Sequence, residues 1–378
     1  MSAMQQQIII GADLVPTTTN IEQFASGDTA ALLGDDLAEL LAAASYRIFN
    51  LEVPLTDKAA PIPKCGPNLI APTQTINGFK AMGVDLLTLA NNHILDQGYE
   101  GLQSTCSVLE KNGIAYVGVG NNCKEASKPF YFEVAGKRVG VYGCVEHEFS
   151  VATEHAAGAN PYDPLESFDH VQHMKEQCDY AIVLYHGGKE LYQYPSPILQ
   201  RTCRKFIEKG ANLVICQHSH CLGCKEEYSD GTIIYGQGNF LFDDSENKLW
   251  KTAVLVCLND DWKVSYVPIV KKENGVRLAS SDEAASILAG FNSRSEEIKT
   301  EIFVESKYQE FADGFLPWYF YSIGGFWRSM VFRAYSRVFH KKPNIAKWYG
   351  EKKINEIINC IDDEAHRELL LAGLKGSK

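Results

Sequence analysis

The sequence predicts an α/β protein whose layered sheets carry a polar site at their strand ends, followed by a helical C-terminal extension. Apolar runs of strand length alternate along the chain with segments whose apolar residues recur at helical spacing. Five of the apolar runs end at Asp, Glu, Asn or His or are followed by one of them within three residues. Because ligands gather beyond the carboxyl ends of strands in open α/β sheets, we expect these five strand ends to contribute to one site.

The composition is that of an ordinary globular chain, long enough for one large core and a smaller unit. Of its 378 residues, 45% are hydrophobic and 22% are charged, and the formal net charge is -11. This acid excess argues against a nucleic-acid binder, because neutralising phosphates requires clustered Lys and Arg. The 11 cysteines are an odd number scattered through apparent strands and helices, so we expect buried thiols rather than a disulfide framework.

The first two predicted strands end in carboxylates. Residues 8–10 form a β-branched run that leads to Asp13. Residues 46–52 form a second strand, which ends in Asn50 and Glu52 before a proline stops it. We expect both strands to deliver their last polar side chains to the same edge of a sheet.

The third predicted strand leads into the most concentrated polar stretch of the sequence. Residues 86–90 form a largely apolar run, which is followed at once by Asn91, Asn92 and His93, with Asp96 three residues further on. A turn or a helix cap explains a pair of asparagines on its own. Together with the other strand ends, this stretch predicts the centre of the site.

Two later strands deliver histidines. Residues 180–186 end in His186, and residues 211–216 are followed by His218 and His220. We expect the last two histidines to lie on an extended segment, where residues two apart project to the same face. A lone histidine at a strand end is most often structural, so the prediction rests on the joint pattern.

The remaining elements complete one α/β sandwich. We expect helices at residues 35–44, 73–82, 97–112, 165–177 and 197–209, and strands at 115–119, 130–134, 137–142, 232–235, 253–258 and 262–270. The proline-rich residues 57–72 are predicted to be a loop over the site or an insertion. Helical periodicity then returns at residues 281–292, 296–311 and 354–374.

The strand ends together offer two carboxylates, an amide oxygen and three imidazoles as metal ligands: Asp13, Glu52, Asn92, His186, His218 and His220. This mixed set suits two divalent ions, Mn, Fe or Zn, better than Ca, which prefers oxygen ligands alone. One carboxylate must bridge two ions, and we choose Glu52 because it ends the strand next to that of Asp13. We expect His93 to be the general acid that protonates the leaving oxygen, with Asp96 orienting it.

These motifs resemble the CapA-type bacterial capsule synthesis family, which is linked to poly-γ-glutamate capsules and belongs to the calcineurin-like metallophosphoesterase superfamily. The resemblance covers about residues 8–270. It rests, in chain order, on Gly11-Ala12-Asp13, Asn50-Leu51-Glu52-Val53-Pro54-Leu55, Leu89-Ala90-Asn91-Asn92-His93-Ile94-Leu95-Asp96-Gln97-Gly98, His186-Gly187-Gly188-Lys189-Glu190, His218-Ser219-His220 and Tyr235-Gly236-Gln237-Gly238-Asn239-Phe240-Leu241-Phe242-Asp243.

The resemblance implies a four-layer α/β/β/α sandwich with the metal site at the strand ends. It supports the same six metal ligands and a general-acid role for His93. It also implies that Asn50, Glu190 and Asn239 line the site. We place Asn91 with the pocket residues and count Glu190 among the catalytic residues.

Two hypotheses of function follow. The first is a CapA-like, dinuclear-metal-dependent hydrolase or transferase that acts on a phosphoester or an amide-linked anionic polymer precursor in capsule, poly-γ-glutamate or exopolysaccharide biosynthesis. The alternative is a metal-independent member of the same fold, acting either as a peptide epimerase with His and Glu as acid and base or as a non-catalytic scaffold in polymer assembly. An anionic small molecule or polymer precursor is the expected partner in the first case.

The sequence also predicts a cytoplasmic location and two domains. The N-terminus has no basic region of the signal-peptide type, and no apolar stretch approaches the roughly 18 residues of a membrane helix. We divide the chain into residues 1–272 and a helical extension, residues 273–378. Within the extension, residues 315–349 are rich in aromatic and basic residues. We expect these aromatics to pack onto the sandwich; contact with a membrane surface or the capsule machinery, a cap on the site and binding of an acidic precursor are alternatives.

Two further features stand close to the predicted site. Cys221 and Cys224 have CxxC spacing, but the second half of a four-cysteine zinc site is missing, so we interpret them as a coincidence or a redox-sensitive pair. His147 follows the strand at residues 139–145. We expect His147 to be a solvated loop residue. If the site contains more residues than those predicted above, His147 is the first candidate to be added.

Overall fold

The computed structural model describes residues 6–242, 246–323, 325–339, 350–362, 366–367, 370 and 374. The chain divides into two compact units, residues 1–304 and residues 305–378. The first unit contains both large sheets and all the predicted site residues. The second unit is described separately below.

The first sheet has a parallel centre and an antiparallel edge. Its strands are β1 (Gln6–Leu14), β2 (Tyr46–Leu51), β3 (Leu86–Thr88), β4 (Ala115–Val117), β13 (Asn239–Leu241), β14 (Thr252–Asn259), β15 (Val264–Lys272) and β16 (Gly275–Leu278). They lie in the order β16-β15-β14-β1-β2-β3-β4, and β13 also pairs with β1. Because β1, β2, β3 and β4 run parallel, their carboxyl ends meet at one edge of the sheet.

The second sheet is built in the same way. Its strands are β6 (Phe130–Val134), β7 (Lys137–Val145), β9 (Tyr180–His186), β10 (Leu213–Gln217), β11 (Leu222–Tyr228) and β12 (Gly231–Gln237), in the order β11-β12-β10-β9-β7-β6. The four central strands run parallel, and β6 and β11 are antiparallel edges. The short strands β5 (Val119–Gly120) and β8 (Gly158–Ala159) form a separate pair.

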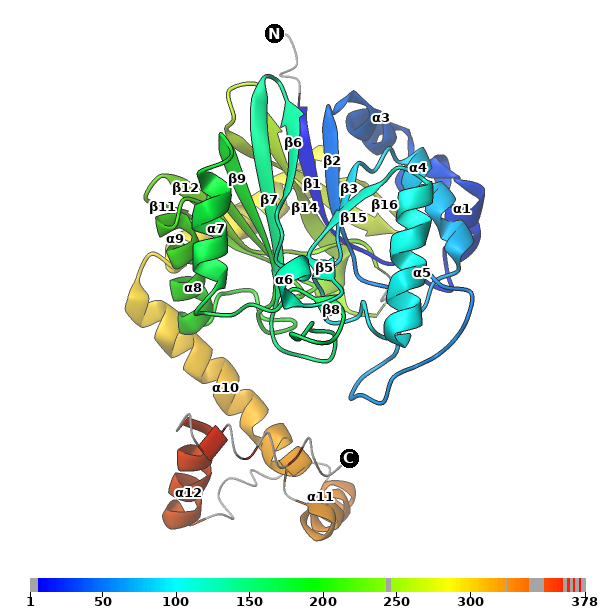
Figure 1. Ribbon diagram of the computed structural model, residues 1–378. Helices are drawn as coiled ribbons and strands as arrows, with labels where there is room; N and C mark the ends of the chain where they lie inside the picture. The colour runs from blue at the N-terminus through cyan, green and yellow to red at the C-terminus, as the bar shows by residue number, and fades with distance from the viewer. Residues whose placement is uncertain are drawn as a thin grey trace. The chain divides into compact units, whose positions relative to one another are not determined.

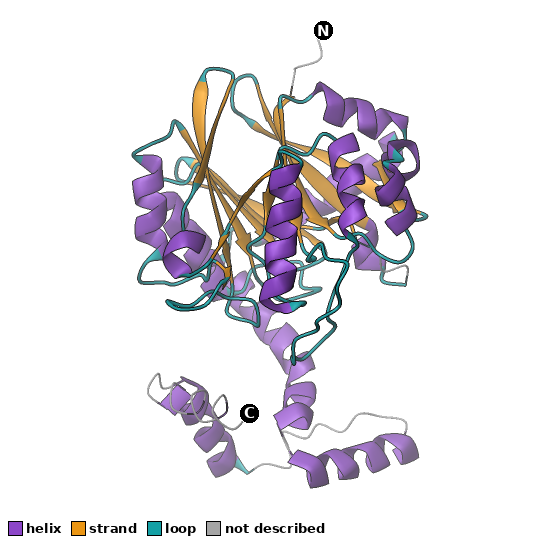
Figure 2. Ribbon diagram, turned by 45° about the vertical axis from the view of Figure 1, so that its right-hand side comes forward, coloured by secondary structure: helices purple, strands orange, loops and turns teal. Residues whose placement is uncertain are grey.

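Helices cover the outer faces of the two sheets (Figure 1, Figure 2). The helices of the first unit are α1 (Ile21–Ser26), α2 (Thr29–Leu33), α3 (Asp35–Ala43), η1 (Thr73–Thr75), α4 (Ile76–Ala81), α5 (Gly98–Lys111), α6 (Cys123–Ala126), α7 (Ser167–Lys175), α8 (Pro197–Glu208), η2 (Lys248–Lys251) and α9 (Ser281–Glu297). Several helices begin where the sequence supplies a cap. Ser196 accepts a hydrogen bond from the Leu199 main chain at the start of α8, which opens with Pro197.

Alternating side chains separate the apolar residues into layers. In β1, Ile8 and Ile10 pack between the sheets, whereas Ile9 packs under the helices that cover the first sheet. In β9, Ile182 lies between the sheets and Val183 packs under α7 and α8. This two-residue alternation gives helix, sheet, sheet and helix layers. The predicted four-layer α/β/β/α fold is therefore confirmed.

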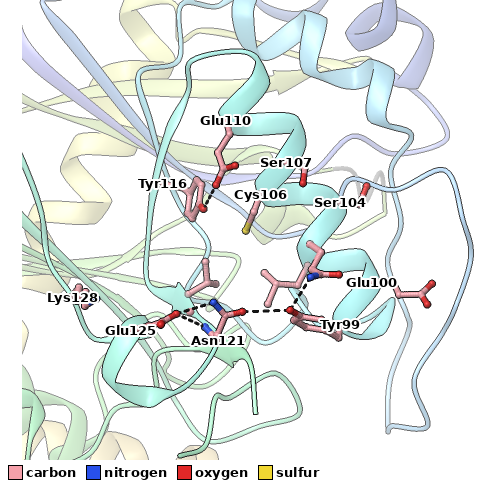
Figure 3. A pocket seen from close by; sticks show the side chains of 14 residues that line it. Tyr99, Glu100, Ser104, Cys106, Ser107, Glu110, Tyr116, Asn121, Glu125 and Lys128 are labelled. Atoms are coloured by element: carbon pink, nitrogen blue, oxygen red, sulfur yellow. Dashed lines mark hydrogen bonds between the residues drawn. The ribbon is translucent and has the colours of Figure 1, made fainter. Parts of the chain in front are cut away.

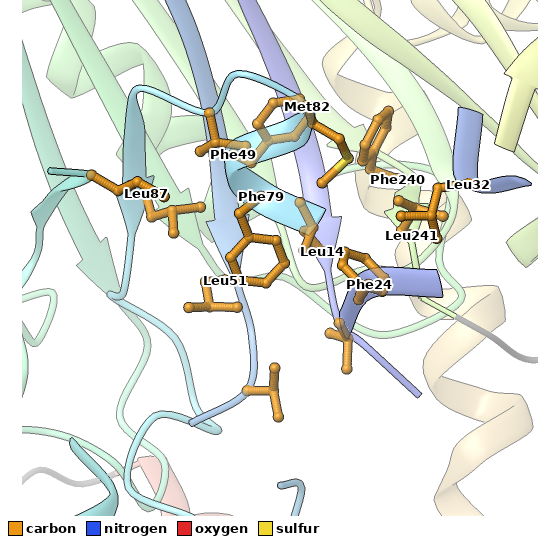
Figure 4. Close-up of a cluster of buried hydrophobic side chains, with 14 of the residues drawn as sticks. Leu14, Phe24, Leu32, Phe49, Leu51, Phe79, Met82, Leu87, Phe240 and Leu241 are labelled. Carbon is orange, nitrogen blue, oxygen red and sulfur yellow. The ribbon is translucent and has the colours of Figure 1, made fainter. Parts of the chain in front are cut away.

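The apolar layer under the first sheet fixes the strands that carry the predicted oxygen ligands. Phe24 of α1 and Phe79 of α4 meet edge to face with ring centroids 5.4 Å apart, and both rings are fully buried (Figure 4). Leu14 of β1 and Leu51 of β2 belong to the same cluster. Burying each such side chain contributes about 1.5–3 kcal/mol. The cluster thus holds the last residues of β1 and β2 against the helices.

The compact first unit extends beyond residue 272, where the sequence placed the domain boundary. Strand β16 pairs with β15 and completes the antiparallel edge of the first sheet. Helix α9 packs on β11 and β15, and its Phe291 is fully buried in the layer between the sheets. The first compact unit ends at residue 304, because the apolar residues of α9 complete the core of the sandwich. The division into functional domains at residue 272 stays a prediction.

The second unit is helical among its described residues, as the sequence predicts. It contains most of α10 (Glu301–Ile323), together with α11 (Gly325–Phe339) and α12 (Glu351–Asp362). Trp318, Tyr319 and Phe339 are 44–57% exposed. Residues 340–349 of the aromatic and basic segment lie outside the described residues. No helix in the described part of the chain is long and apolar enough to span a membrane.

Candidate metal centre

The carboxyl ends of five strands bring the six predicted metal ligands together. The first sheet contributes oxygen ligands from the ends of β1, β2 and β3, and the second sheet contributes imidazoles from the ends of β9 and β10. None of the six side chains is more than 8% exposed: Asp13, Glu52, Asn92, His186, His218 and His220. The cluster is therefore a buried polar site at the place where α/β sheets bind ligands.

The ligands form two groups that share Glu52. Ligand atoms of Asp13, Glu52 and His220 lie within 4.8 Å of one another, and so do those of Glu52, His186 and His218. His220 Nδ1 is 3.3 Å from Asp13 Oδ2, and His186 Nε2 is 3.3 Å from Glu52 Oε1. Glu52 thus lies at the junction of the two groups, which is the position that a bridging carboxylate requires.

Asn92 belongs to the second group. Its Oδ1 lies 3.1 Å from His186 Nε2, and the same nitrogen is 3.2 Å from His218 Nδ1. Because a ring nitrogen carries at most one proton, His186 Nε2 cannot donate to Glu52, Asn92 and His218 at once. Hydrogen bonding alone therefore does not account for this convergence, whereas a cation bound among these atoms does.

Buried carboxylate oxygens in the cluster lack hydrogen-bond partners. Among the described residues, none donates a hydrogen bond to either oxygen of Glu52 or to Asp13 Oδ2. Burial alone would raise the pKa of the Glu52 carboxyl, but His186 and His220 outweigh it and hold that pKa well below its usual range. A buried, ionised carboxylate without hydrogen bonds needs a counter-charge. These residues therefore fit divalent cations.

The two histidines after β10 have opposite electrostatic environments. Burial, together with His186 and His220, lowers the pKa of His218 well below its usual value. Burial also works against a charged His220, but Glu52 and Asp13 raise the pKa of His220 to about 9. His218 is therefore neutral, as a metal ligand must be, while His220 holds a proton that a bound cation would replace.

The segment after β10 corrects the expectation of an extended strand. His218 has φ 81° and His220 has φ 52°, which is the left-handed region that non-glycine residues seldom adopt. Such backbone conformations cost of order 1–3 kcal/mol and occur mostly at functional sites. The turn directs the two imidazoles to different ligand groups instead of to one common face.

The path of β1 changes just before Asp13. The pairing of β1 with β2 shifts in register between Ile10 and Asp13, as at a β-bulge, which re-aims the side chain that follows. Gly11 lies within this shift, and a Cβ atom there would meet the Phe49 ring at 2.2 Å. The sequence Gly11-Ala12-Asp13 thus lets the chain pass close to the neighbouring strand while it delivers the carboxylate.

Two of the three amides that the sequence places in the pocket contact the ligands, and the third supports one of them. Asn50 Nδ2 donates to Asp13 Oδ1 over 2.8 Å, and Asn91 Nδ2 donates to Asn50 Oδ1 over 3.1 Å. Asn239 stands opposite Asp13 in the β1–β13 pair, and its Oδ1 lies 3.0 Å from His220 Nδ1. Asn50 and Asn239 therefore orient ligand side chains, and Asn91 holds Asn50 in place.

His93 and Asp96 form a buried pair beside Asn92. His93 Nδ1 lies 2.6 Å from Asp96 Oδ2, and the Asp96 side chain is fully buried. Lys64, from the proline-rich loop of residues 57–72, forms an ion pair with Asp96. The geometry places Asp96 where it can orient His93. Lys64 carried no signal in the sequence, because it lies between prolines and follows no strand.

Glu190 does not lie in the cluster. It is exposed, in a turn between Gly188 at φ 105° and Leu191 at φ 60°. The Leu191 main-chain N–H donates to the Ser219 carbonyl over 2.8 Å, so this turn lies against the segment that carries His218 and His220. Glu190 belongs to neither candidate ligand group, and its catalytic role stays a prediction from sequence. The carboxylate that contacts a ligand is Glu148, whose Oε2 accepts a 2.8 Å hydrogen bond from Asn92 Nδ2.

Glu148 belongs to the strand end that the sequence singled out through His147. His147 is exposed, as expected; Glu148 is exposed as well but reaches Asn92, and Glu146 is half-buried. Burial raises the pKa of Glu146, which accepts a 3.2 Å hydrogen bond from the Tyr185 hydroxyl. The pattern Glu-His-Glu directly after an apolar strand could have identified both carboxylates as site residues, but only its histidine is considered in the sequence prediction.

Cys221 and Cys224 take no part in a metal site among the described residues. Both thiols are buried and free, and Cys224 lies within β11. Burial raises the pKa of Cys221 to about 12 and raises that of Cys224 as well. Thiols in this state are weak nucleophiles and poor metal ligands, which is consistent with coincidental spacing.

A separate cavity of about 730 Å³ lies between α5 and the segment from β4 to α6 (Figure 3). Its lining includes Tyr99, Glu110, Tyr116, Asn121 and Glu125, and none of the six candidate metal ligands. Glu125 accepts hydrogen bonds from the Asn121 side chain and main chain. Because the converging donors lie elsewhere, the candidate site is the strand-end cluster and not this cavity.

A four-layer sandwich with carboxylates, amides and imidazoles at its strand ends defines a calcineurin-like metallophosphoesterase fold. The model of the family described as bacterial capsule synthesis protein PGA_cap matches residues 8–244. The chain belongs to this family. It is 28% identical over 194 residues to the capsule biosynthesis protein CapA of Bacillus anthracis, covering 50% of this chain and 47% of that protein. It is 27% identical over 185 residues to the PGA biosynthesis protein CapA of Bacillus subtilis, covering 48% and 49%.

The chain therefore spans about half the length of these curated relatives. Among solved structures, it is similar to a novel phosphatase from Mycoplasma pneumoniae, with 15% identity, a TM-score of 0.44 and coverage of 72% of this chain and 96% of that one. It is also similar to a 5′-nucleotidase precursor from Thermus thermophilus, with 14% identity, a TM-score of 0.39 and coverage of 76% and 58%.

Proposed function

We propose that this protein is a hydrolase or transferase of the phosphoesterase type that depends on two divalent metal ions, Mn, Fe or Zn. The observation that carries the proposal is the pair of buried ligand groups that share Glu52. The names of the two Bacillus relatives support a setting in capsule, poly-γ-glutamate or exopolysaccharide biosynthesis. The proposed substrate is an anionic small molecule or polymer precursor.

The two ions would share one bridging carboxylate. One ion would be held by Asp13, Glu52 and His220, and the other by Glu52, Asn92, His186 and His218. When bound, the ions supply positive charge that activates a water molecule and stabilises phosphoryl oxygens. The amides behind the ligands fix the orientation of the ligand side chains, as the partners of metal ligands commonly do.

His93 is the group that moves a proton. Because Asp96 Oδ2 lies 2.6 Å from Nδ1, Nε2 is the ring nitrogen left to protonate the leaving oxygen of the substrate. Asp96 keeps the ring in this orientation, and the buried position of the pair keeps competing water away. A positioned general acid contributes about 10²- to 10⁴-fold to the rate.

Metal analysis of the purified protein is the first test. Protein expressed in medium supplemented with Mn or Zn should retain close to two equivalents of transition metal and hydrolyse an aryl phosphodiester. Retention of less than about a tenth of an equivalent would contradict the proposal and favour the metal-independent alternative, a peptide epimerase or a scaffold.

The His93→Ala variant is the second test. It should keep its metal and lose turnover by about 10²- to 10⁴-fold, because only the proton donor is removed. His155→Ala is the matched control, since the His155 side chain is 92% exposed, and it should leave both quantities unchanged. Unchanged turnover in His93→Ala would remove His93 from the role of general acid.

A further inference from the structure

Lys64 is a buried cation in a loop that the sequence marks only by its prolines. Its side chain is 2% exposed, and its ammonium group pairs with the fully buried Asp96. Lys64 Nζ also lies 3.2 Å from His93 Nδ1 and 5.6 Å from the centre of the Phe149 ring. A lysine is seldom buried unless it is paired, so this position requires a reason.

The loop of residues 57–72 is built on the Asp96–Gln97 turn. The Leu69 main-chain N–H donates to Asp96 Oδ2 over 2.6 Å, and the Ile62 N–H donates to the Asp96 carbonyl over 3.1 Å. Gln97 holds both arms of the loop, because it accepts from the Ala60 N–H over 2.7 Å and donates to the Leu69 carbonyl over 2.9 Å. The carboxylate of Asp96 thus contacts both the loop and His93.

The charges explain why the loop brings a lysine. A buried Asp96 that faced His93 alone would leave a charge to be compensated by the imidazole. The ammonium of Lys64 supplies a compensating charge beside Asp96. Nδ1 of His93 then lies against both Asp96 and Lys64, which restricts the ring to one orientation.

We propose that Lys64 is a positioning residue for the general acid: docking of the 57–72 loop places its ammonium on Asp96 and thereby fixes the His93 ring. The part of this inference that concerns turnover rests on the function proposed above. The part that concerns the state of the His93 ring does not. The loop is accordingly a component of the site, although none of its residues is a candidate metal ligand.

The state of the His93 ring is measured by nitrogen-15 NMR of metal-free protein labelled at histidine. The wild-type ring should give one sharp set of ring signals, as a single ring orientation does. In Lys64→Met, and in Lys64→Gln as a second variant without the charge, these signals should broaden or split, as they do for a ring that samples several orientations. Lys58→Met is the matched control, because Lys58 lies in the same loop but pairs with Glu100 at the surface over 2.6 Å. A His93 ring signal that stays single and as sharp as in wild type in a folded Lys64 variant would overturn the proposal.

Turnover gives the second measurement, with two aryl phosphodiesters whose leaving groups are phenol and 4-nitrophenol. A poor leaving group needs the acid and a good one does not. Lys64→Met should lower kcat about 10- to 100-fold for the phenyl ester, with unchanged KM and metal content, and only slightly for the nitrophenyl ester. Equal losses for both esters, or losses that add fully to those of His93→Ala, would mean a merely structural role and overturn the proposal.

The two measurements separate the failure of this inference from failure of the proposed function. A wild-type protein that turns over neither ester contradicts the phosphoesterase function, while the NMR comparison still decides whether Lys64 fixes His93. A wild-type protein that turns over both esters and a Lys64→Met variant with unchanged kcat contradict the role of Lys64 alone.

Discussion

The two sheets contribute different chemistry to the same small volume. The first sheet supplies oxygen ligands, Asp13, Glu52 and Asn92, and the second sheet supplies imidazoles from the ends of β9 and β10. Each candidate group of ligands draws on both sheets. The difference teaches that the mixed donor set is a property of the sandwich: neither sheet alone offers both oxygen and nitrogen ligands.

The two sheets also position their ligands differently. Asp13 follows a register shift within β1, so the ladder on both sides of it limits its movement. His218 and His220 lie beyond β10 in a turn with left-handed backbone. Strained turns persist only where the surroundings over-determine them. Strand pairing therefore holds the oxygen half of the site, and packing around a strained turn holds the imidazole half.

The largest effect is expected where the two halves meet. Glu52→Gln removes the only side chain common to both ligand groups, so metal content and turnover should each fall by more than about 10²-fold, beyond the effect of losing a supporting residue. Metal analysis and phosphodiesterase assays measure this. Glu176→Gln, at an exposed position, is the control. A Glu52→Gln protein that keeps both ions would show that Glu52 is not shared.

Replacing an imidazole ligand of the second sheet with an oxygen ligand tests the comparison between the two sheets. His218→Asp replaces an imidazole of the second sheet with an oxygen ligand, so zinc affinity should fall by about 10- to 100-fold and manganese should be favoured. Competition between equal concentrations of the two ions, followed by metal analysis, measures the preference. An unchanged ratio of zinc to manganese would mean that the nitrogen ligands do not set selectivity.

A smaller effect is expected for a residue that contacts a metal ligand but is not a ligand itself. Glu148→Ala removes the acceptor that holds the Asn92 amide, so metal affinity should fall about tenfold while the fold is kept. Titration of the metal-free protein measures the affinity. Glu154→Ala, whose side chain is 88% exposed, should leave it unchanged. Equal affinities in the two variants would contradict the supporting role of Glu148.

The smallest effect is expected at Glu190. Because this residue is exposed and belongs to neither candidate ligand group, Glu190→Gln should change kcat by less than about twofold, as for other surface substitutions. Steady-state kinetics on the aryl phosphodiester measure this. A loss of tenfold or more would instead support the catalytic role that the family resemblance implies.

Much of the fold follows from local pattern. The strands that carry ligands, such as β1 and β9, are apolar runs with clear ends, and the hairpin of β6 and β7 has its turn at Ala135-Gly136. Strand β11 could not be found in this way, because it combines CxxC residues with a Lys-Glu-Glu stretch. The short β16 is a strand because it pairs with β15, and the local sequence pattern does not indicate this pairing.

A residue of the candidate site could be predicted from the sequence only where it lies at the end of a strand. The carboxyl ends of parallel strands converge, so Asp13 and His186 could be brought together before any coordinates. Lys64 could not, because its place depends on how a loop docks on Asp96. The position of Glu190 could not be predicted for the same reason, since two left-handed residues decide the direction of its turn.

The shared position of Glu52 has a thermodynamic consequence. Two sites with one ligand in common are not independent, so occupation of either changes the affinity of the other by the same factor, whichever is filled first. Cation binding is accordingly expected to deviate from a simple sum of two hyperbolic isotherms. Glu52, at the junction of the two sheets, thus couples cation binding at one site to cation binding at the other.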